Sequence, residues 1–208
     1  MTTILPKGPG PIEPQMVPAP QPPMPPGAEE AKLFSQSGVI MLTDKFDQEH
    51  IMPLVKQIMI YNMMPEDKQP EEIKLYINSP GGVVFSAWHL IDVIKQSRIP
   101  VSTIAMGLAA SCGVLTLMSG VKGKRYATQN TSIMSHQYAW GSAGKEHELY
   151  AKVKEFEMAS NRMVEHYKKC TGKNEKYIRN HLLSPTDEWM TPEEAVKHGI
   201  IDEVIKTY

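Results

Sequence analysis

The hydrophobic residues of this chain recur in two alternating patterns from residue 38 onward. Strand-like segments, most of them apolar, lie at residues 38–42, 73–77, 101–106, 124–127 and 132–137. Between them, apolar positions spaced three or four residues apart predict helices over residues 47–63, 84–96 and 111–118. Repeated strand-then-helix order favours an α/β fold with a mostly parallel sheet covered by helices.

Helix signals dominate the last third of the chain. Residues 145–170 form one long helical stretch whose apolar stripe consists of Leu149, Val153, Phe156, Met163 and Tyr167. Gly172 is a typical stop signal after this helix. The helix is long for so small a domain, so we expect part of it to pack on another subunit. A Thr191 cap followed by Pro192 and Glu194 predicts the start of a further helix.

The N-terminal segment differs in composition from the rest. Ten of the 17 prolines fall between Pro6 and Pro26. Proline fixes its own φ and lacks a backbone donor, so this segment is expected to be extended or disordered. We therefore divide the chain into a flexible arm, residues 1–27, and one folded domain, residues 28–208. A solvated tail is the simplest interpretation of the arm, while a docking arm, a pore-lining tail and a removable leader stay open.

Composition narrows the class of protein. With 208 residues, 41% of them hydrophobic, the chain can bury one core, and its net charge of −1 gives no reason to expect nucleic-acid binding. Two cysteines predict no disulfide framework and suggest a reducing compartment, the cytoplasm. Residues 99–121 carry no charge over 23 positions, but their Pro, Gly and Ser breaks favour a strand, a turn and a buried helix over a membrane span.

The seven histidines show no metal-ligand spacing with cysteine or carboxylate partners, so we expect neither a metal ion nor another cofactor. His147, His166 and His181 lie in charge-rich helical segments, where we expect them to be solvated. His136 differs from these because it lies near the end of a predicted strand.

One small-residue segment carries the strongest chemical signal. Residues 107–113, Gly-Leu-Ala-Ala-Ser-Cys-Gly, begin with a predicted turn that presents Ser111 without bulky neighbours. His136 follows 25 positions later, and Asp187 lies in a loop before a predicted helix. A serine hydroxyl needs a base to become a nucleophile, and an acid orients that base. The pattern indicates a serine hydrolase with the chain order Ser, His, Asp, although His136 and Asp187 are each also compatible with a structural role. Cys112 stays open as an alternative nucleophile, but its apolar neighbours favour a buried filler.

A second glycine-rich turn, Asn-Ser-Pro-Gly-Gly at residues 78–82, is a candidate source of oxyanion donors. We expect the backbone N–H groups of Gly82 and Cys112 to bind the developing charge, and each such donor contributes roughly 3–4 kcal/mol in the transition state. A helix that begins near Ser111 would add the positive end of its dipole. A tight turn without chemistry is the alternative.

Five groups of residues together match one known pattern. They are residues 76–82 (YINSPGG), 107–111 (GLAAS), 120–125 (GVKGKR), 134–137 (MSHQ) and 189–195 (WMTPEEA) with 199–202 (GIID). On these motifs the chain resembles the ClpP family, the proteolytic subunits of Clp proteases, from about residue 38 to residue 205. The resemblance implies that Ser111 is the nucleophile, His136 the base and Asp187 the orienting acid. It also implies that the backbone N–H groups of Gly82 and Cys112 form the oxyanion hole.

The resemblance further implies a crotonase-like fold of ββα repeats and an assembly of subunits into a homo-oligomer. In this family heptameric rings stack as a tetradecamer around an enclosed chamber, and a helix like residues 145–170 forms the handle that joins the rings. Mixed rings of related subunits would be a variant of this assembly. An ATP-driven AAA+ unfoldase would deliver unfolded protein, since the chain itself has no Gly-x-x-x-x-Gly-Lys-Ser/Thr phosphate loop.

Several features depart from the family pattern. Thr186 stands where arginine often precedes the acid, Tyr138 where proline commonly follows the His-Gln pair, and Cys112 where methionine is usual. The Pro-rich arm replaces a segment that forms pore loops in the family. Two other classes of protein stay open. One is a regulatory or structural subunit of a mixed ring without its own activity, and the other is a crotonase-type enzyme acting on acyl-CoA thioesters.

Overall fold

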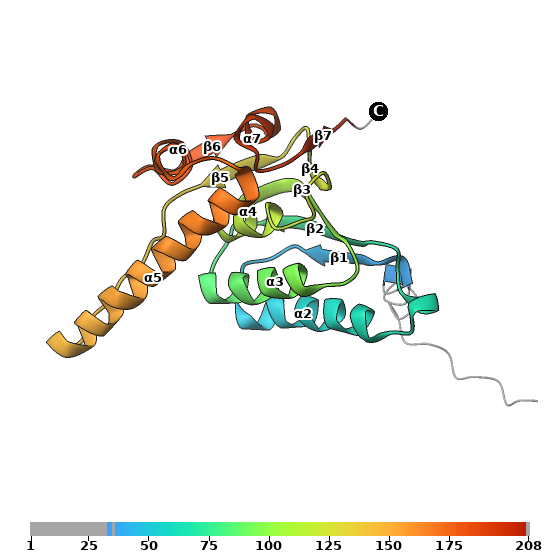
Figure 1. The fold of residues 1–208 in the computed structure, drawn as a ribbon, viewed down its shortest axis with the longest axis horizontal. Helices are drawn as coiled ribbons and strands as arrows, with labels where there is room; N and C mark the ends of the chain where they lie inside the picture. Colours follow the sequence, from blue (N-terminus) through green and yellow to red (C-terminus); the bar gives the residue numbers. More distant parts are fainter. Residues whose placement is uncertain (1–32, 35, 207–208) are drawn as a thin grey trace, which may run out of the picture.

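The computed structural model describes residues 33–34 and 36–206 (Figure 1). The predicted flexible arm, residues 1–27, lies outside the described residues, and so does the predicted domain boundary at residue 28. The division of the chain into an arm and a domain therefore stays a prediction.

The predicted strands and helices are all present, and the structure adds four short elements that the sequence analysis did not predict, at residues 66–68, 175–181, 188–190 and 203–205. In chain order they are β1 (Val39–Leu42), α2 (Gln48–Met63), the short 3₁₀ helix η1 (Glu66–Lys68), β2 (Ile73–Ser79), α3 (Val84–Gln96), β3 (Val101–Ala110), α4 (Cys112–Leu117), β4 (Arg125–Thr128), β5 (Ser132–Ser135), α5 (Glu146–Thr171), α6 (Glu175–His181), β6 (Glu188–Met190), α7 (Pro192–His198) and β7 (Glu203–Ile205).

Within the described part of the chain, seven strands form one sheet. The main order is β1-β2-β3-β4-β7, and β5 pairs with the far end of β3 and with β6. All pairings are parallel except that of β5 with β6, which is antiparallel. This topology confirms the predicted α/β fold with a mostly parallel sheet.

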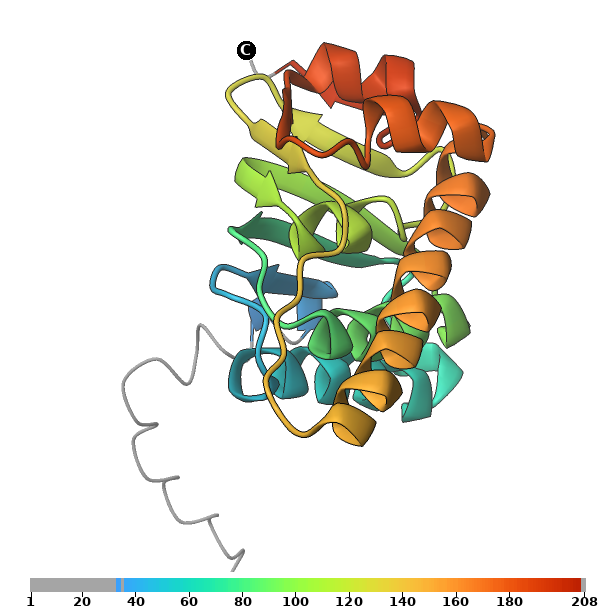
Figure 2. The same ribbon diagram turned by 90° about the vertical axis from the view of Figure 1, so that its left-hand side faces the viewer.

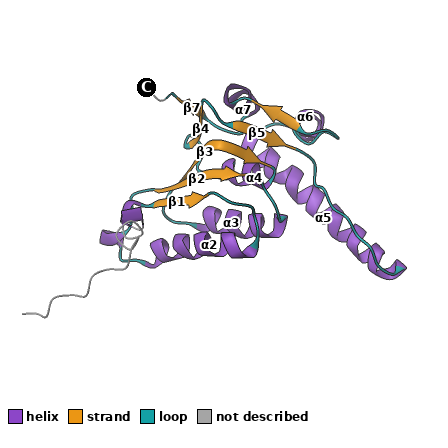
Figure 3. Cartoon of the chain, turned by 180° about the vertical axis from the view of Figure 1, so that it is seen from behind, coloured by secondary structure: helices purple, strands orange, loops and turns teal. Residues whose placement is uncertain are grey.

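Helices cover this sheet in two groups. Helices α2 and α3 lie side by side next to β1, and α4 lies between α3 and the strands β2 and β3 (Figures 1 and 3). At the other end of the sheet, α6 contacts α5, and α7 contacts β5, β6 and β7 (Figure 2). The inward side chains of β2 show why the layers hold together, because Ile73, Leu75 and Ile77 are fully buried while alternate residues are not.

The third strand is longer than predicted. The Gly107–Ala110 segment, expected to be a turn, continues β3 up to Ala110. Its last residues pair with β5, in the register Leu108↔Ser132 and Ala110↔Met134, and Ala109 pairs with β2. The small residues of this segment predict a turn in the sequence. In the structure, β2 and β5 supply backbone hydrogen-bond partners on both sides, and these keep the segment extended.

Helix α5 is buried over only part of its length. Its inward residues are Ala159, Met163, Val164 and Tyr167, all in its C-terminal half. The N-terminal half extends beyond the body of the molecule, and Tyr150 there is 70% exposed (Figures 1 and 3). The predicted apolar stripe is therefore a core face only from about residue 156 onward. Gly172 ends the helix in the left-handed conformation, as its position predicts.

The prediction that His166 is solvated was wrong. Its Nε2 lies 3.2 Å from Ser119 Oγ and 3.0 Å from the Leu115 carbonyl oxygen, and its ring packs edge-on against Trp88. Burial lowers the pKa of His166 to about 4. His166 lies three residues after Met163, on the side of α5 that packs against the domain, and this helical position outweighs the charged residues around it in the sequence. His147 and His181 are exposed, as predicted.

No helix in residues 36–206 is both long enough and apolar enough to cross a membrane. The uncharged stretch 99–121 forms β3 and α4 with the turns around them, as predicted.

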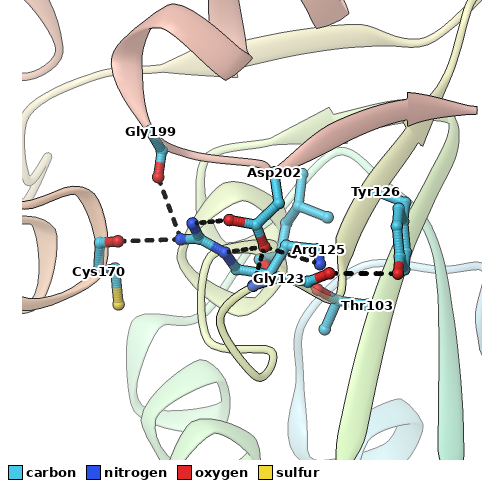
Figure 4. A network of polar contacts seen from close by, with 8 residues as sticks. Thr103, Gly123, Arg125, Tyr126, Cys170, Gly199 and Asp202 are labelled. Atoms are coloured by element: carbon cyan, nitrogen blue, oxygen red, sulfur yellow. Dashed lines mark hydrogen bonds and ion pairs between the residues drawn. The ribbon is translucent and has the colours of Figure 1, made fainter.

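A buried ion pair fastens the last part of the chain to the sheet (Figure 4). The Arg125 side chain at the start of β4 is 4% exposed and binds both carboxylate oxygens of Asp202. Arg125 Nη1 also donates to the carbonyl oxygens of Cys170, at 2.9 Å, and Gly199, at 3.0 Å. The Asp202 carboxylate accepts from the backbone N–H of Gly123 as well. One guanidinium thereby joins β4, the end of α5 and the segment before β7.

Replacing Asp202 with asparagine should destabilise the fold strongly, because it leaves the charge of Arg125 buried without a partner. We expect a loss of about 3 kcal/mol, or roughly 6–12 °C in thermal unfolding followed by circular dichroism. Burial alone would raise the pKa of Asp202, but hydrogen bonds and the charge of Arg125 outweigh it and lower the pKa below 3.8. The difference in stability between the wild type and the variant is therefore complete above pH 3.8. It shrinks as the pH falls through the lowered pKa of Asp202.

The matched control is Glu175→Gln, which breaks the exposed Arg179–Glu175 pair on α6. This change should cost less than about 1 kcal/mol. Equal melting of the two variants would contradict the role assigned to the buried pair.

Candidate active site

Ser111 occupies a sharp turn between a strand and a helix. It follows β3 directly, precedes the first residue of α4, and is the only non-glycine residue in the described part of the chain with a positive φ, 54°. Such a conformation costs of order 1–3 kcal/mol and is held by the surrounding structure. Here the N–H of Ser111 donates to the Met134 carbonyl oxygen at 2.8 Å, which continues the β3–β5 ladder by one step. The turn lifts the serine side chain out of the sheet and leaves it half-buried.

Gly81 is the closest neighbour of this turn. A Cβ atom added to Gly81 would lie 2.7 Å from Ser111 Cβ and 2.9 Å from the Ala110 carbonyl oxygen. The φ of Gly81 is +96°, a value that side chains disfavour. Gly81 of the 78–82 motif is therefore required by the close approach of two backbones beside Ser111.

His136 lies one residue beyond the end of β5 and faces the serine. Its Nε2 is 2.8 Å from Ser111 Oγ, and its Nδ1 is 2.6 Å from the carbonyl oxygen of Gln137. A carbonyl oxygen only accepts hydrogen bonds, so Nδ1 carries a proton, and in the neutral imidazole Nε2 then presents a lone pair. Nε2 in this tautomer accepts the hydrogen bond from the serine hydroxyl, which is the state that a general base requires.

Asp187 lies beside His136 without binding it. The antiparallel pairing of β5 with β6 ends with Ser135 opposite Glu188, so His136 and Asp187 are the residues just outside the last pair. The Asp187 side chain is nevertheless exposed, and the Nδ1 partner of His136 is the Gln137 carbonyl oxygen. The structure thus brings Ser111 and His136 into hydrogen-bond contact and leaves Asp187 outside the hydrogen-bonded pair.

The two expected oxyanion donors come from different segments at the same place. Phe46 pairs with the 81–83 backbone through its N–H to the Gly81 carbonyl and its carbonyl to the Val83 N–H. In this parallel bridge the N–H of Gly82 points away from Phe46. On that other side the Gly82 carbonyl accepts from Cys112 Sγ at 3.3 Å, so the edge of Gly82 faces the start of α4. The N–H of Cys112 is in the first turn of α4, where N–H groups have no acceptor within the helix.

Gly82 also requires the absence of a side chain. A Cβ there would lie 2.5 Å from the Phe46 carbonyl oxygen, and the φ of Gly82 is +144°. The backbone on both sides of this residue is therefore fixed by its contact with Phe46, which prevents the N–H from turning.

A cavity of about 350 Å³ opens beside the serine–histidine pair. Its apolar wall consists of Val83, Val84, Phe85, Tyr138, Trp140 and Met163. Two of its aromatic rings pack on Phe156 of α5, with centroid distances of 5.7 Å for Tyr138 and 5.1 Å for Trp140. Sequence analysis missed these aromatic residues as part of the site, because nothing in the linear pattern shows that the segment after β5 folds back along α5. A cavity of about 370 Å³ near the C-terminal ends of α3 and α5 includes neither Ser111 nor His136.

The thiol of Cys112 is poorly suited to be the nucleophile. Its side chain is buried, and burial raises its pKa to about 11. A thiolate is the reactive form of cysteine, and this environment suppresses it. In the described part of the chain no group of three or more His, Cys, Asp and Glu side chains is arranged to hold a metal ion.

The folded protein should therefore protect Cys112 from alkylation. Burial both hides the Cys112 thiol from the reagent and raises its pKa to about 11, so iodoacetamide should modify it only after unfolding. Peptide mass spectrometry of the native and the guanidinium-unfolded protein measures this difference at a single residue. Equally fast modification of Cys112 in both states would return it to the list of candidate nucleophiles.

Two comparisons with known proteins identify the family of this chain. The family described as Clp protease matches residues 28–208 of the chain. A curated protein from Deinococcus radiodurans, named "ATP-dependent Clp protease proteolytic subunit", is 38% identical over 154 residues, which cover 73% of this chain and 74% of that protein. The residues that the family model matches include every strand of the described sheet. The chain belongs to the Clp protease family and is a protease.

Proposed function

We propose that this chain is the proteolytic subunit of an ATP-dependent Clp-type protease and cleaves peptide bonds as a serine endopeptidase. The observation that carries the proposal is the 2.8 Å contact between Ser111 Oγ and the unprotonated Nε2 of His136. The contact joins a strained, half-buried hydroxyl to a base in the correct tautomer, at the edge of a cavity large enough for substrate side chains.

The proposed reaction is acyl transfer in two steps. Ser111 Oγ attacks the peptide carbonyl carbon while its proton passes to His136 Nε2. The carbonyl oxygen becomes an oxyanion, which the N–H groups of Gly82 and Cys112 bind. The C–N bond then breaks as His136 returns the proton to the leaving amine, and an ester on Ser111 remains. Water, deprotonated by His136, hydrolyses this ester and restores the serine.

Asp187 completes the proposed triad. The Gln137 carbonyl sets the tautomer of His136, but a neutral oxygen offers little compensation for the positive charge that the imidazole gains during the reaction. A carboxylate does so, and it also holds the ring in place. Ser135 and Glu188 are the last pair of the β5–β6 ladder, and His136 and Asp187 are the residues just outside it. In the proposed mechanism the Asp187 side chain turns toward the ring and takes the place of the Gln137 carbonyl at Nδ1.

The family implies an oligomeric ring that works with an ATPase. We propose a homo-oligomer of heptameric rings, stacked in pairs, with a AAA+ unfoldase supplying unfolded protein. The exposed N-terminal half of α5 supports this proposal, since Tyr150, Val153 and Met158 present a large apolar surface there. A cytoplasmic location is compatible with two cysteines that are both free thiols.

One observation favours a second candidate function. The His136 ring binds the Gln137 carbonyl oxygen and not the Asp187 carboxylate. Thr186, which departs from the family pattern, directly precedes Asp187. A regulatory subunit of a mixed ring, active weakly or only beside a related subunit, would have such a site. Probe labelling and peptide cleavage, described next, distinguish an active protease subunit from a regulatory one.

Ser111→Ala should abolish peptide cleavage, by at least about 10⁴-fold, and should leave the thermal unfolding unchanged. A fluorophosphonate probe should label the wild type at Ser111 and should not label the variant. Ser132→Ala removes an exposed hydroxyl at the start of β5 and is the matched control that keeps activity. An unlabelled wild type would favour the regulatory subunit, and turnover of acyl-CoA thioesters in place of peptides would favour a crotonase-type enzyme.

Asp187→Asn should lower kcat by roughly 10²–10⁴-fold, because an amide cannot stabilise the imidazolium. Its effect on KM should be small, since Asp187 contacts no substrate in the proposed reaction. Glu193→Gln, an exposed carboxylate on α7, controls for the loss of one negative charge. Full activity of the Asp187 variant would leave the Gln137 carbonyl as the sole partner that His136 needs.

A further inference from the structure

A buried chain of hydrogen bonds lies directly behind His136. Ser135 Oγ is 2.6 Å from the hydroxyl of Tyr167, and it also binds the carbonyl oxygen of Leu182. Ser135 is 0% exposed and Tyr167 is 1% exposed. A serine and a tyrosine in contact inside a core are uncommon, because each hydroxyl loses its water and must be compensated by a protein partner.

The direction of this chain follows from the chemistry of its members. The Leu182 carbonyl only accepts, so the single hydroxyl proton of Ser135 goes to it. The proton between the two side chains then comes from Tyr167, which donates to Ser135 Oγ. Burial raises the pKa of Tyr167 well above its ordinary value, so the phenol keeps this proton at any pH at which the protein works.

The chain joins three segments that matter for the site. Tyr167 belongs to α5, Ser135 is the last residue of β5 and immediately precedes His136, and Leu182 follows α6. The segment that starts at Leu182 leads to Asp187. Ser135 therefore links the strand of the base to the segment of the acid through a contact that solvent does not reach.

A second bond does the same on the other side of His136. Gln137 Nε2 donates to the Ser184 carbonyl oxygen at 3.2 Å. The residues before and after His136 thus bind the carbonyl groups of Leu182 and Ser184, two positions apart on one segment. Ser184 Oγ in turn donates to the Glu188 carboxylate, next to Asp187. Of these two bonds, the one from Ser135 to Leu182 is also supported by the Tyr167 hydroxyl, which donates to Ser135 Oγ.

We infer that Ser135 and Tyr167 are positioning residues for catalysis, and that their buried hydrogen bonds fix His136 relative to Ser111 and to the segment of Asp187. The inference rests on the proposed function. An apolar pair would fill the same space, but it would lack the direction of a hydrogen bond and would let β5 shift against the 182–187 segment. A displacement of about 1 Å at a catalytic group can cost about a hundredfold in rate.

Two variants remove the hydrogen bonds of Ser135 one after the other. Tyr167→Phe removes the outer donor and leaves Ser135 bound to Leu182, whereas Ser135→Ala removes both bonds at once. We expect kcat to fall about threefold in the first and at least about tenfold in the second, with KM changed by less than about twofold. Both are measured with a fluorogenic peptide on the assembled, full-length protein. The kcat is expressed per active site, counted by titration with the fluorophosphonate probe, so that unfolded or unassembled chains do not contribute.

The matched control is Thr131→Val. Thr131 Oγ1 is buried and donates to the Ala105 carbonyl oxygen at 3.0 Å, so this change also removes a core hydroxyl-to-carbonyl bond. It should lower the melting temperature as Ser135→Ala does and keep kcat per site. Loss of kcat per site in the Ser135 variant alone supports positioning. Unchanged kcat per site in both, with only the melting temperature lowered, overturns it, whereas a wild type that the probe does not label overturns the proposed function itself.

Discussion

The site depends on the pairing of β5 with two strands at once. Its parallel contact with the end of β3 carries Met134 to the backbone of Ser111, and its antiparallel contact with β6 carries Ser135 to Glu188. A four-residue strand thereby aligns segments that lie more than fifty positions apart in the chain. The register of β5 determines which side chains reach the site, because a shift of one residue would turn each side chain of β5 to the opposite face of the sheet.

The rest of the molecule supports this alignment from outside. The Arg125–Asp202 pair binds β4 to the end of α5 and to the segment before β7, all on the flank where β5 and β6 lie. Tyr167, on the same helix α5, reaches the end of β5 from behind. The helix therefore serves two roles along its length. Its C-terminal half stabilises the site, while its N-terminal half presents apolar surface outward.

The arrangement of His136 separates two functions that one carboxylate performs in a completed triad. The Gln137 carbonyl defines which nitrogen carries the proton, so the pair with Ser111 exists before the acid engages. Stabilisation of the imidazolium is the role that the proposed function assigns to Asp187.

The sequence by itself determined the order of the main strands and helices, the cap at Thr191, the end of α5 at Gly172 and Ser111 as a candidate nucleophile. These features follow from local rules, namely periodicity, capping and the small residues that flank a reactive side chain. The tertiary structure alone decided the length of β3, the burial of His166, the aromatic wall around Phe156 and the Nδ1 partner of His136. Each of these depends on a backbone group or a face supplied by a distant segment. Backbone groups are the same in every residue, so the linear pattern contains no signal for them.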